Sequence, residues 1–153
     1  MNRAPAFVSA ESWEAARSLV TFVPLQPSYT AGFDLQGLHI HVRDHKAREL
    51  AAGDRTLEAH YGGFVLSQSR GPAAEVRRKA LDVSYGREPQ EALIAGREAR
   101  IYELGPEPDP DDIDGRSPAV VVWHDGNLFL LVASSQMDSR ELVRVALSIY
   151  VGR

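Results

Sequence analysis

One stretch near the end of the chain, residues 119–134, constrains the fold more than any other. It reads A-V-V-V-W-H-D-G-N-L-F-L-L-V-A-S, which is two apolar runs separated by a short polar one. Asp125-Gly126 supplies the two positive-φ positions of a tight type I′ turn, so the stretch predicts a β-hairpin. Successive side chains of a strand point to opposite faces, and here both sets are apolar. We therefore expect this hairpin inside a sheet that is covered on both faces.

Other strands are predicted by alternation of apolar and polar residues and by glycines that mark turns. Gly62-Gly63 joins two of these strands, and Gly96 lies in the turn between two others. Successive strands joined by such short turns pair antiparallel. The expected strands are residues 35–44, 57–61, 64–69, 93–95 and 99–104.

Two helices are predicted at the ends of the chain. Ser9 is placed as the N-cap of a helix that runs to about Val20, because a serine hydroxyl accepts a free backbone N–H of the first turn. Near the other end, Asp138 with Glu141 three residues later resembles a capping box, and apolar residues follow at helical spacing. This C-terminal helix is expected to cover one face of the central hairpin, and the N-terminal helix is a candidate for the other face.

These elements predict a single domain over residues 1–153, in which residues 1–8 are frayed. The fold class is α+β: a central antiparallel sheet of about five to seven strands, built from hairpins and covered by an N-terminal and a C-terminal helix. A chain of 153 residues is long enough for one such hydrophobic core.

Charge and composition exclude several kinds of partner. The formal net charge is −4, and residues 105–118 alone carry five acidic groups against one arginine, so the remainder is neutral. A neutral body weighs against nucleic-acid binding, which needs a basic face. The chain has no cysteine, which excludes disulfides and thiolate metal sites. No apolar run reaches the length of a membrane segment, and the first residues lack the apolar core of a signal peptide.

The acidic stretch also suggests calcium, because its carboxylates are hard oxygen ligands. Aligned to an EF-hand loop that starts at Asp109, however, Asp114 occupies the position where glycine is required. Four prolines interrupt regular structure in and beside the stretch. A solvated loop is the simpler interpretation.

Three parts of the sequence together resemble a known family. They are the Pro27-Ser28-Tyr29-x-x-Gly32 connection, the Trp123-x-Asp125-Gly126 hairpin and the closing helix R-E-L-V-x-V-A-x-S-I at residues 140–149. They are similar to a bacterial domain family of unknown function that lies on the extracytoplasmic side of some anti-sigma factors and in related lipoproteins. The resemblance implies an antiparallel sheet with helical cover, an extracytoplasmic location and no established activity. If the chain is complete as given, a cytoplasmic location is expected instead.

The strongest candidate for chemistry is a polar face formed by His39, His41, Glu58 and His60. The pattern His-x-His on a strand places both imidazoles on one face, and a neighbouring strand brings Glu58 and His60 alongside. Nitrogen and oxygen donors of this kind suit zinc. A polar, solvated strand face without metal is the alternative.

Two functions are therefore carried forward. The first is a non-enzymatic extracytoplasmic sensing or interaction domain that binds a protein partner or a small apolar ligand. Its pocket is expected between the sheet and a helix, lined by some of the aromatic residues that otherwise fill the core: Trp13, Phe22, Tyr29, Phe33, Phe64, Trp123 and Phe129. No catalytic residue is assigned, because no nucleophile motif is complete. The second is a metal-binding protein or metal-dependent enzyme that uses the histidine cluster. Either a monomer or a homodimer joined through a sheet edge is consistent with the sequence.

Overall fold

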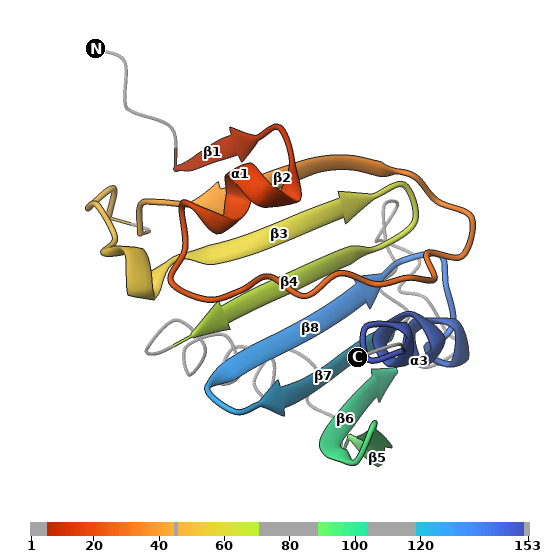
Figure 1. Cartoon of the computed structure of the whole chain (residues 1–153). Helices are drawn as coiled ribbons and strands as arrows, with labels where there is room; N and C mark the ends of the chain where they lie inside the picture. Colours follow the sequence, from red (N-terminus) through yellow and green to blue (C-terminus); the bar gives the residue numbers. More distant parts are fainter. Residues whose placement is uncertain (1–5, 45, 71–88, 104–118, 152–153) are drawn as a thin grey trace, which may run out of the picture.

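A computed structural model describes residues 6–44, 46–70, 89–103 and 119–151 of the chain. Its main feature is one antiparallel sheet of eight strands in the order β1-β2-β3-β4-β8-β7-β6-β5 (Figure 1). The strands are β1 (Phe7–Ala10), β2 (Leu35–His41), β3 (Thr56–Tyr61), β4 (Val65–Arg70), β5 (Gln90–Ile94), β6 (Arg97–Glu103), β7 (Ala119–Asp125) and β8 (Leu128–Ser134). The sheet is therefore larger than the five to seven strands expected.

The predicted central hairpin is confirmed. Strands β7 and β8 pair along their full length, and they lie between β6 and β4 in the sheet. Their turn differs from the prediction: Asp125 pairs with Leu128, so the two loop residues are Gly126 and Asn127, and only Gly126 has a positive φ, of 61°. A glycine at the first loop position with this φ is typical of a type II′ turn, which also matches the twist of the strands.

The N-terminal helix was predicted wrongly. Helix α1 covers only Trp13–Arg17, and its N-cap is Ser12, whose side chain accepts a hydrogen bond from the Ala15 N–H at 3.0 Å. Residues 7–10 are instead the edge strand β1, which pairs with β2. Two of the residues expected to be frayed, Phe7 and Val8, thus belong to the sheet. Pairing with β2 satisfies the backbone of this segment, and the helix can begin only after it.

The C-terminal helix is confirmed. Helix α3 (Ser139–Ser148) begins after Asp138, whose carboxylate accepts from the Glu141 N–H at 3.0 Å. Its apolar side packs on β7 and β8, which makes this side of the sheet the helix face. The fully buried residues of this contact are Leu142, Val145, Ala146 and Ile149.

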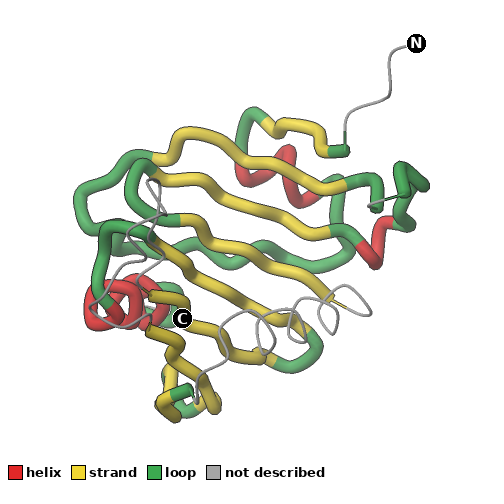
Figure 2. Tube along the Cα trace, turned by 180° about the vertical axis from the view of Figure 1, so that it is seen from behind, coloured by secondary structure: helices red, strands yellow, loops and turns green. Residues whose placement is uncertain are grey.

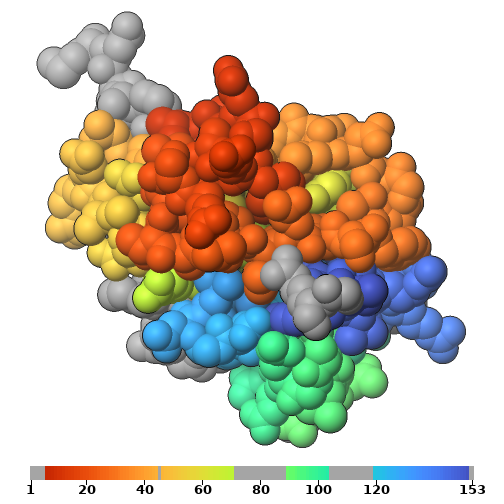
Figure 3. Space-filling view, viewed as in Figure 1, coloured from red at the N-terminus to blue at the C-terminus, as the bar shows by residue number. Residues whose placement is uncertain are grey.

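The rest of the helix face is covered by an extended segment, residues 18–34, and not by the N-terminal helix that was the candidate cover. Figures 1 and 3 show this segment running across the middle strands in front of the sheet. The Gln68 side chain on β4 bonds the backbone of Leu25 twice, accepting from its N–H at 2.7 Å and donating to its carbonyl at 2.8 Å. The Ser148 hydroxyl of α3 accepts from the Ser28 and Tyr29 N–H groups. The segment therefore finds backbone partners without forming a helix.

The α+β class with two covering helices is accordingly wrong. The described chain is mostly one antiparallel sheet with little helix. Pro24 and Pro27 lie in the covering segment and oppose helix formation there. Hydrogen bonds to the buried side chains of Gln68 on β4 and Ser148 on α3 keep the segment extended.

The opposite side of the sheet carries the four predicted site residues, and we call it the histidine face. Seen from behind in Figure 2, no helix of the described chain lies in front of it. Its half over β2 and β3 is polar, whereas its half over β6–β8 carries a second apolar cluster. The buried members of that cluster are Tyr102, Val120, Val122, Phe129 and Leu131.

Candidate functional site

The pairing of β2 with β3 brings the predicted site residues together. In the register of the two strands, His39 lies opposite Glu58, His41 opposite Thr56 and His60 opposite Gly37. Directly opposite and diagonal side chains of an antiparallel pair are within contact distance on one face. Glu58 therefore lies in the centre of the three histidines. Two of them, His39 and His41, share a face of β2 because they are two residues apart.

Glu58 contacts two of these histidines with its two carboxylate oxygens. The Nε2 atom of His60 lies 3.0 Å from Oε1, and the Nε2 atom of His41 lies 3.3 Å from Oε2. The Glu58 side chain is 17% exposed, and the two histidine side chains are about one-third exposed, at 36% and 34%. The carboxylate is thus held within the polar half of the face, while both rings reach solvent.

His39 is placed differently from the other two histidines. Its ring lies between Phe7, stacked at 4.7 Å between centroids, and His60, at 4.6 Å. A side-chain carbon at Gly37 would come within 3.1 Å of His39 Nε2, so the glycine leaves room for this ring. The His39 ring is therefore held between the rings of Phe7 and His60, and its Nε2 atom lies next to Gly37.

The metal hypothesis stays a prediction. Within the described residues, no group of three or more His, Asp or Glu side chains is placed so that it could hold a metal ion. The histidine set is arranged as a hydrogen-bonded cluster around one carboxylate. The acidic stretch at 105–118, considered for calcium, lies outside the described residues.

Next to this cluster, two serine hydroxyls on β4 are buried on the same face. Ser67 lies opposite Glu58 in the sheet, and Ser69 lies opposite Thr56. Both are at most 1% exposed, and their hydroxyls have no hydrogen-bond partner among the described residues. A buried polar group without a partner is rare in folded proteins.

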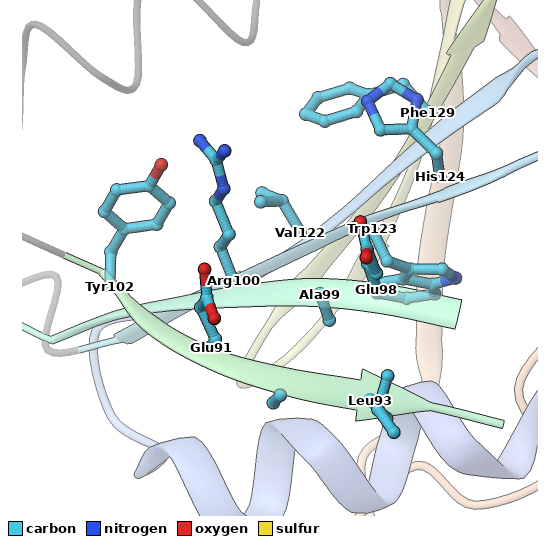
Figure 4. Close-up of a pocket in the computed structure, with 11 residues that line it drawn as sticks. Glu91, Leu93, Glu98, Ala99, Arg100, Tyr102, Val122, Trp123, His124 and Phe129 are labelled. Carbon is cyan, nitrogen blue, oxygen red and sulfur yellow. The ribbon is translucent and has the colours of Figure 1, made fainter. Parts of the chain in front are cut away.

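A cavity of about 430 Å³ opens at the other end of the sheet, beside β5 to β8. Its described lining includes Val122 and Phe129, which are at most 5% exposed, and the solvent-exposed side chains Glu91, Glu98, Arg100 and His124. Figure 4 shows Tyr102, Arg100, Val122, His124 and Phe129 rising from their strands on the same side. The cavity therefore has an apolar floor and a polar rim.

Hydrogen bonds on the helix face hold Trp123, one of the residues that line the cavity, in place. Trp123, which lines the cavity and is 1% exposed, donates from Nε1 to the Tyr150 hydroxyl at 2.9 Å, and that hydroxyl donates to Asp125 at 2.9 Å. Arg97 lies over the Tyr150 ring at 4.0 Å and beside the same carboxylate. Burial is the main cause that raises the pKa of Tyr150, and it keeps the phenol in the protonated form that donates.

Sequence reasoning expected a pocket between the sheet and a helix, lined by some of seven aromatic residues. Two of the seven, Trp123 and Phe129, line this cavity, but it opens mainly on the histidine face, and its rim was missed. Alternation in R-E-A-R-I-Y-E at residues 97–103 places Glu98, Arg100 and Tyr102 on one face, and this pattern could have identified them. Glu91 on β5 joins the set because it lies opposite Arg100 in the sheet.

Comparisons with known proteins add no assignment. No family model, no curated protein and no solved structure matches the chain. Among the described residues, no helix is long and apolar enough to cross a membrane. The site must therefore be interpreted from its own geometry.

Proposed function

We propose that this chain is a non-enzymatic sensing or interaction domain that binds an apolar organic ligand in the cavity beside β5 to β8. The observation that carries the proposal is the combination of a cavity of about 430 Å³ with an apolar floor and a polar rim. Small-molecule sites are typically clefts of roughly 300–1,000 Å³ with mostly apolar walls and a few polar groups that orient the ligand.

The residues that line the cavity favour ligand binding over catalysis. Its described members include no serine, threonine or cysteine that would act as a nucleophile. The floor offers an aromatic ring, Phe129, and the rigid Val122 side chain, which suit a planar or branched apolar group. Because both floor residues are packed in the second apolar cluster, the site is preformed.

The rim restricts the polar end of the ligand. It carries two carboxylates, Glu91 and Glu98, against the single guanidinium of Arg100. Glu91 lies opposite Arg100 in the sheet, where opposite charges attract. A neutral or cationic polar group is therefore favoured over an anionic one.

The extracytoplasmic setting is part of the same proposal, and it rests on the resemblance of three sequence segments. A sensing domain that binds an apolar ligand or a protein partner outside the cytoplasm needs no catalytic group. Cell fractionation that recovers the native protein only from the cytoplasm would contradict this setting.

Ligand binding is tested with the neutral dye N-phenyl-1-naphthylamine. Trp123 lines the cavity and serves as energy-transfer donor once the other tryptophan is removed by Trp13→Phe. We expect saturable dye binding with quenching of the Trp123 emission. Leu93→Glu, on the cavity wall and 65% exposed, should weaken binding about tenfold, which is the effect of about 1.4 kcal/mol.

The matched control is Val23→Glu, the same kind of change at a residue that is 56% exposed and outside the cavity lining. It should bind the dye as the parent does. Absence of saturable binding, or equal affinity in the two glutamate variants, would refute the cavity as the ligand site.

A further inference from the structure

Strand β5 forms one edge of the sheet, at the bottom of Figure 1. Among the described residues it pairs with β6 alone, in a continuous register without a bulge. Gln90 and Glu91 are exposed, and Leu93 is 65% exposed, the second most exposed large apolar residue after Val151. The backbone groups along an edge strand form a template for pairing with another chain.

The turn between β5 and β6 determines which backbone groups of β5 face outward. Both residues of Ala95-Gly96 have a positive φ, of 49° and 83°, as in a two-residue type I′ turn. The flanking residues Ile94 and Arg97 therefore exchange backbone hydrogen bonds, and such pairs alternate along the two strands with non-bonded pairs. It follows that the N–H and C=O groups of Glu91 and Leu93 point away from β6.

A second copy of β5 can use all of these outward groups. When the two strands run antiparallel about a twofold axis at Ala92, Glu91 lies opposite Leu93 of the second copy, and the converse pair is equivalent. Each pair exchanges both of its backbone hydrogen bonds. At the axis, where the strands approach most closely, each copy presents only the small side chain of Ala92.

The neighbouring twofold registers are worse. An axis at Glu91 sets two carboxylates opposite each other and pairs Leu93 with Pro89, which has no N–H to donate. An axis at Leu93 pairs Glu91 with Ala95, whose carbonyl already accepts from the Arg97 side chain at 3.0 Å. The register centred on Ala92 is therefore preferred.

We propose that β5 pairs with β5 of a second copy of this chain about a twofold axis at Ala92, which joins the two sheets. Charge does not oppose this association, because residues 90–103 carry three glutamates and two arginines, a net charge of −1. Only five residues of each copy form the edge, so the dimer is small and its formation depends on concentration.

The pairing also brings the second copy to the ligand cavity, and this part of the inference rests on the proposed function. Glu91 and Leu93 both line the cavity. Directly opposite residues of an antiparallel pair lie on the same face, so Leu93 of the second copy comes beside Glu91. Each copy thereby adds an apolar side chain to the open edge of the other copy's cavity.

Sedimentation equilibrium of the full chain, without ligand, tests the pairing. From about 10 μM to about 1 mM, the average mass should rise from 16.8 kDa toward twice that value. Leu93→Glu places like charges opposite each other and should weaken the dimer about tenfold, whereas Leu93→Lys faces Glu91 with an opposite charge and should keep it. Val23→Glu, at a residue that is 56% exposed and outside β5, is the matched control and should dimerise as the parent does.

Disulfide formation tests the register, because the chain has no cysteine of its own. Ala92→Cys should form a linked dimer on oxidation, since facing residues at the axis are within disulfide distance, and Glu91→Cys should not. A parent chain that stays at 16.8 kDa throughout, equal weakening by Leu93→Glu and Leu93→Lys, or linkage through Glu91→Cys alone would overturn the proposal.

Dye binding separates this inference from the proposed function. N-phenyl-1-naphthylamine should bind the parent about threefold more tightly at protein concentrations where the dimer predominates. Equal affinity in monomer and dimer would overturn the contribution of Leu93 to the second cavity. A dimer that binds no dye would refute the proposed ligand site and leave the pairing supported.

Discussion

Replacement of Gln68 by leucine should detach the extended segment that covers the sheet. Gln68 is fully buried on β4, between the apolar side chains Leu57 and Leu130 of the neighbouring strands. Its amide pairs both backbone groups of Leu25, at 2.7 Å and 2.8 Å. Leucine fits the apolar row by size and character but cannot make either bond.

The expected loss follows from the two backbone groups left behind. A buried donor or acceptor that loses its partner costs about 1–3 kcal/mol. Leu25 is half-buried, so water partly replaces the lost bonds, and the leucine side chain gains favourable apolar contacts. The net decrease in the free energy of unfolding should be about 1.5–3 kcal/mol. With urea m-values of about 1–3 kcal/mol/M, the midpoint should fall by about 1 M.

Urea unfolding followed by tryptophan fluorescence measures the global effect, and hydrogen exchange of the Leu25 amide measures the local one. Gln26→Leu is the matched control, because it makes the same change one residue further along at an exposed position. It should leave both readouts unchanged. A Gln68→Leu chain as stable as the parent, with unchanged protection of the Leu25 amide, would refute the role of this side chain.

Two further predictions concern tyrosines that hold α3 in place. Tyr150→Phe should destabilise the fold by about 1–3 kcal/mol in urea unfolding, because the buried Trp123 N–H loses its acceptor. Burial raises the pKa of Tyr150, so the parent should also lose stability as the pH rises above about 10. The variant should lose less, and the part that remains comes from Tyr29 and Tyr61, whose pKa values are also raised. The hydrogen bond from Tyr29 is the largest cause that lowers the pKa of Glu141, and the hydrogen bond from Arg144 is the second. The ionised Glu141 therefore stabilises the fold at a pH above the pKa that it has in the unfolded chain. This stabilisation is lost as the pH falls through the lower pKa that it has in the folded chain. Tyr29→Phe should raise the Glu141 pKa toward its ordinary value in an NMR titration.

The parts of the fold that could be predicted are those with local signals. The 119–134 hairpin was found because two apolar runs flank a glycine turn, and helix α3 because Asp138 caps it three residues before Glu141. Alternation on β2 and β3 also placed the histidines on one face. In each case the physical cause lies within a few residues of the element it determines.

The parts that were mistaken depend on contacts far apart in the chain. The helix starting at Ser9 was predicted from a capping pattern, but residues 7–10 form a strand because they pair with β2. The covering role of the extended segment was also missed, because the segment is held by Gln68, 43 residues away from Leu25, and by Ser148, 120 residues away from Ser28. No local pattern identifies a buried glutamine or serine as the partner of a distant backbone. Likewise, the rim of the cavity depends on the pairing of β5 with β6.

The treatment of buried polar groups distinguishes the two faces of the sheet. On the helix face, Gln68 and Ser148 are buried and fully used by the chain's own backbone. On the histidine face, Ser67 and Ser69 are equally buried, yet their hydroxyls have no partner among the described residues. A hydroxyl that makes no bond contributes nothing to stability and costs its desolvation. Ser67→Ala should therefore be neutral or slightly stabilising in urea unfolding, opposite in sign to Gln68→Leu, and a clear loss of stability would show that the chain itself uses this hydroxyl.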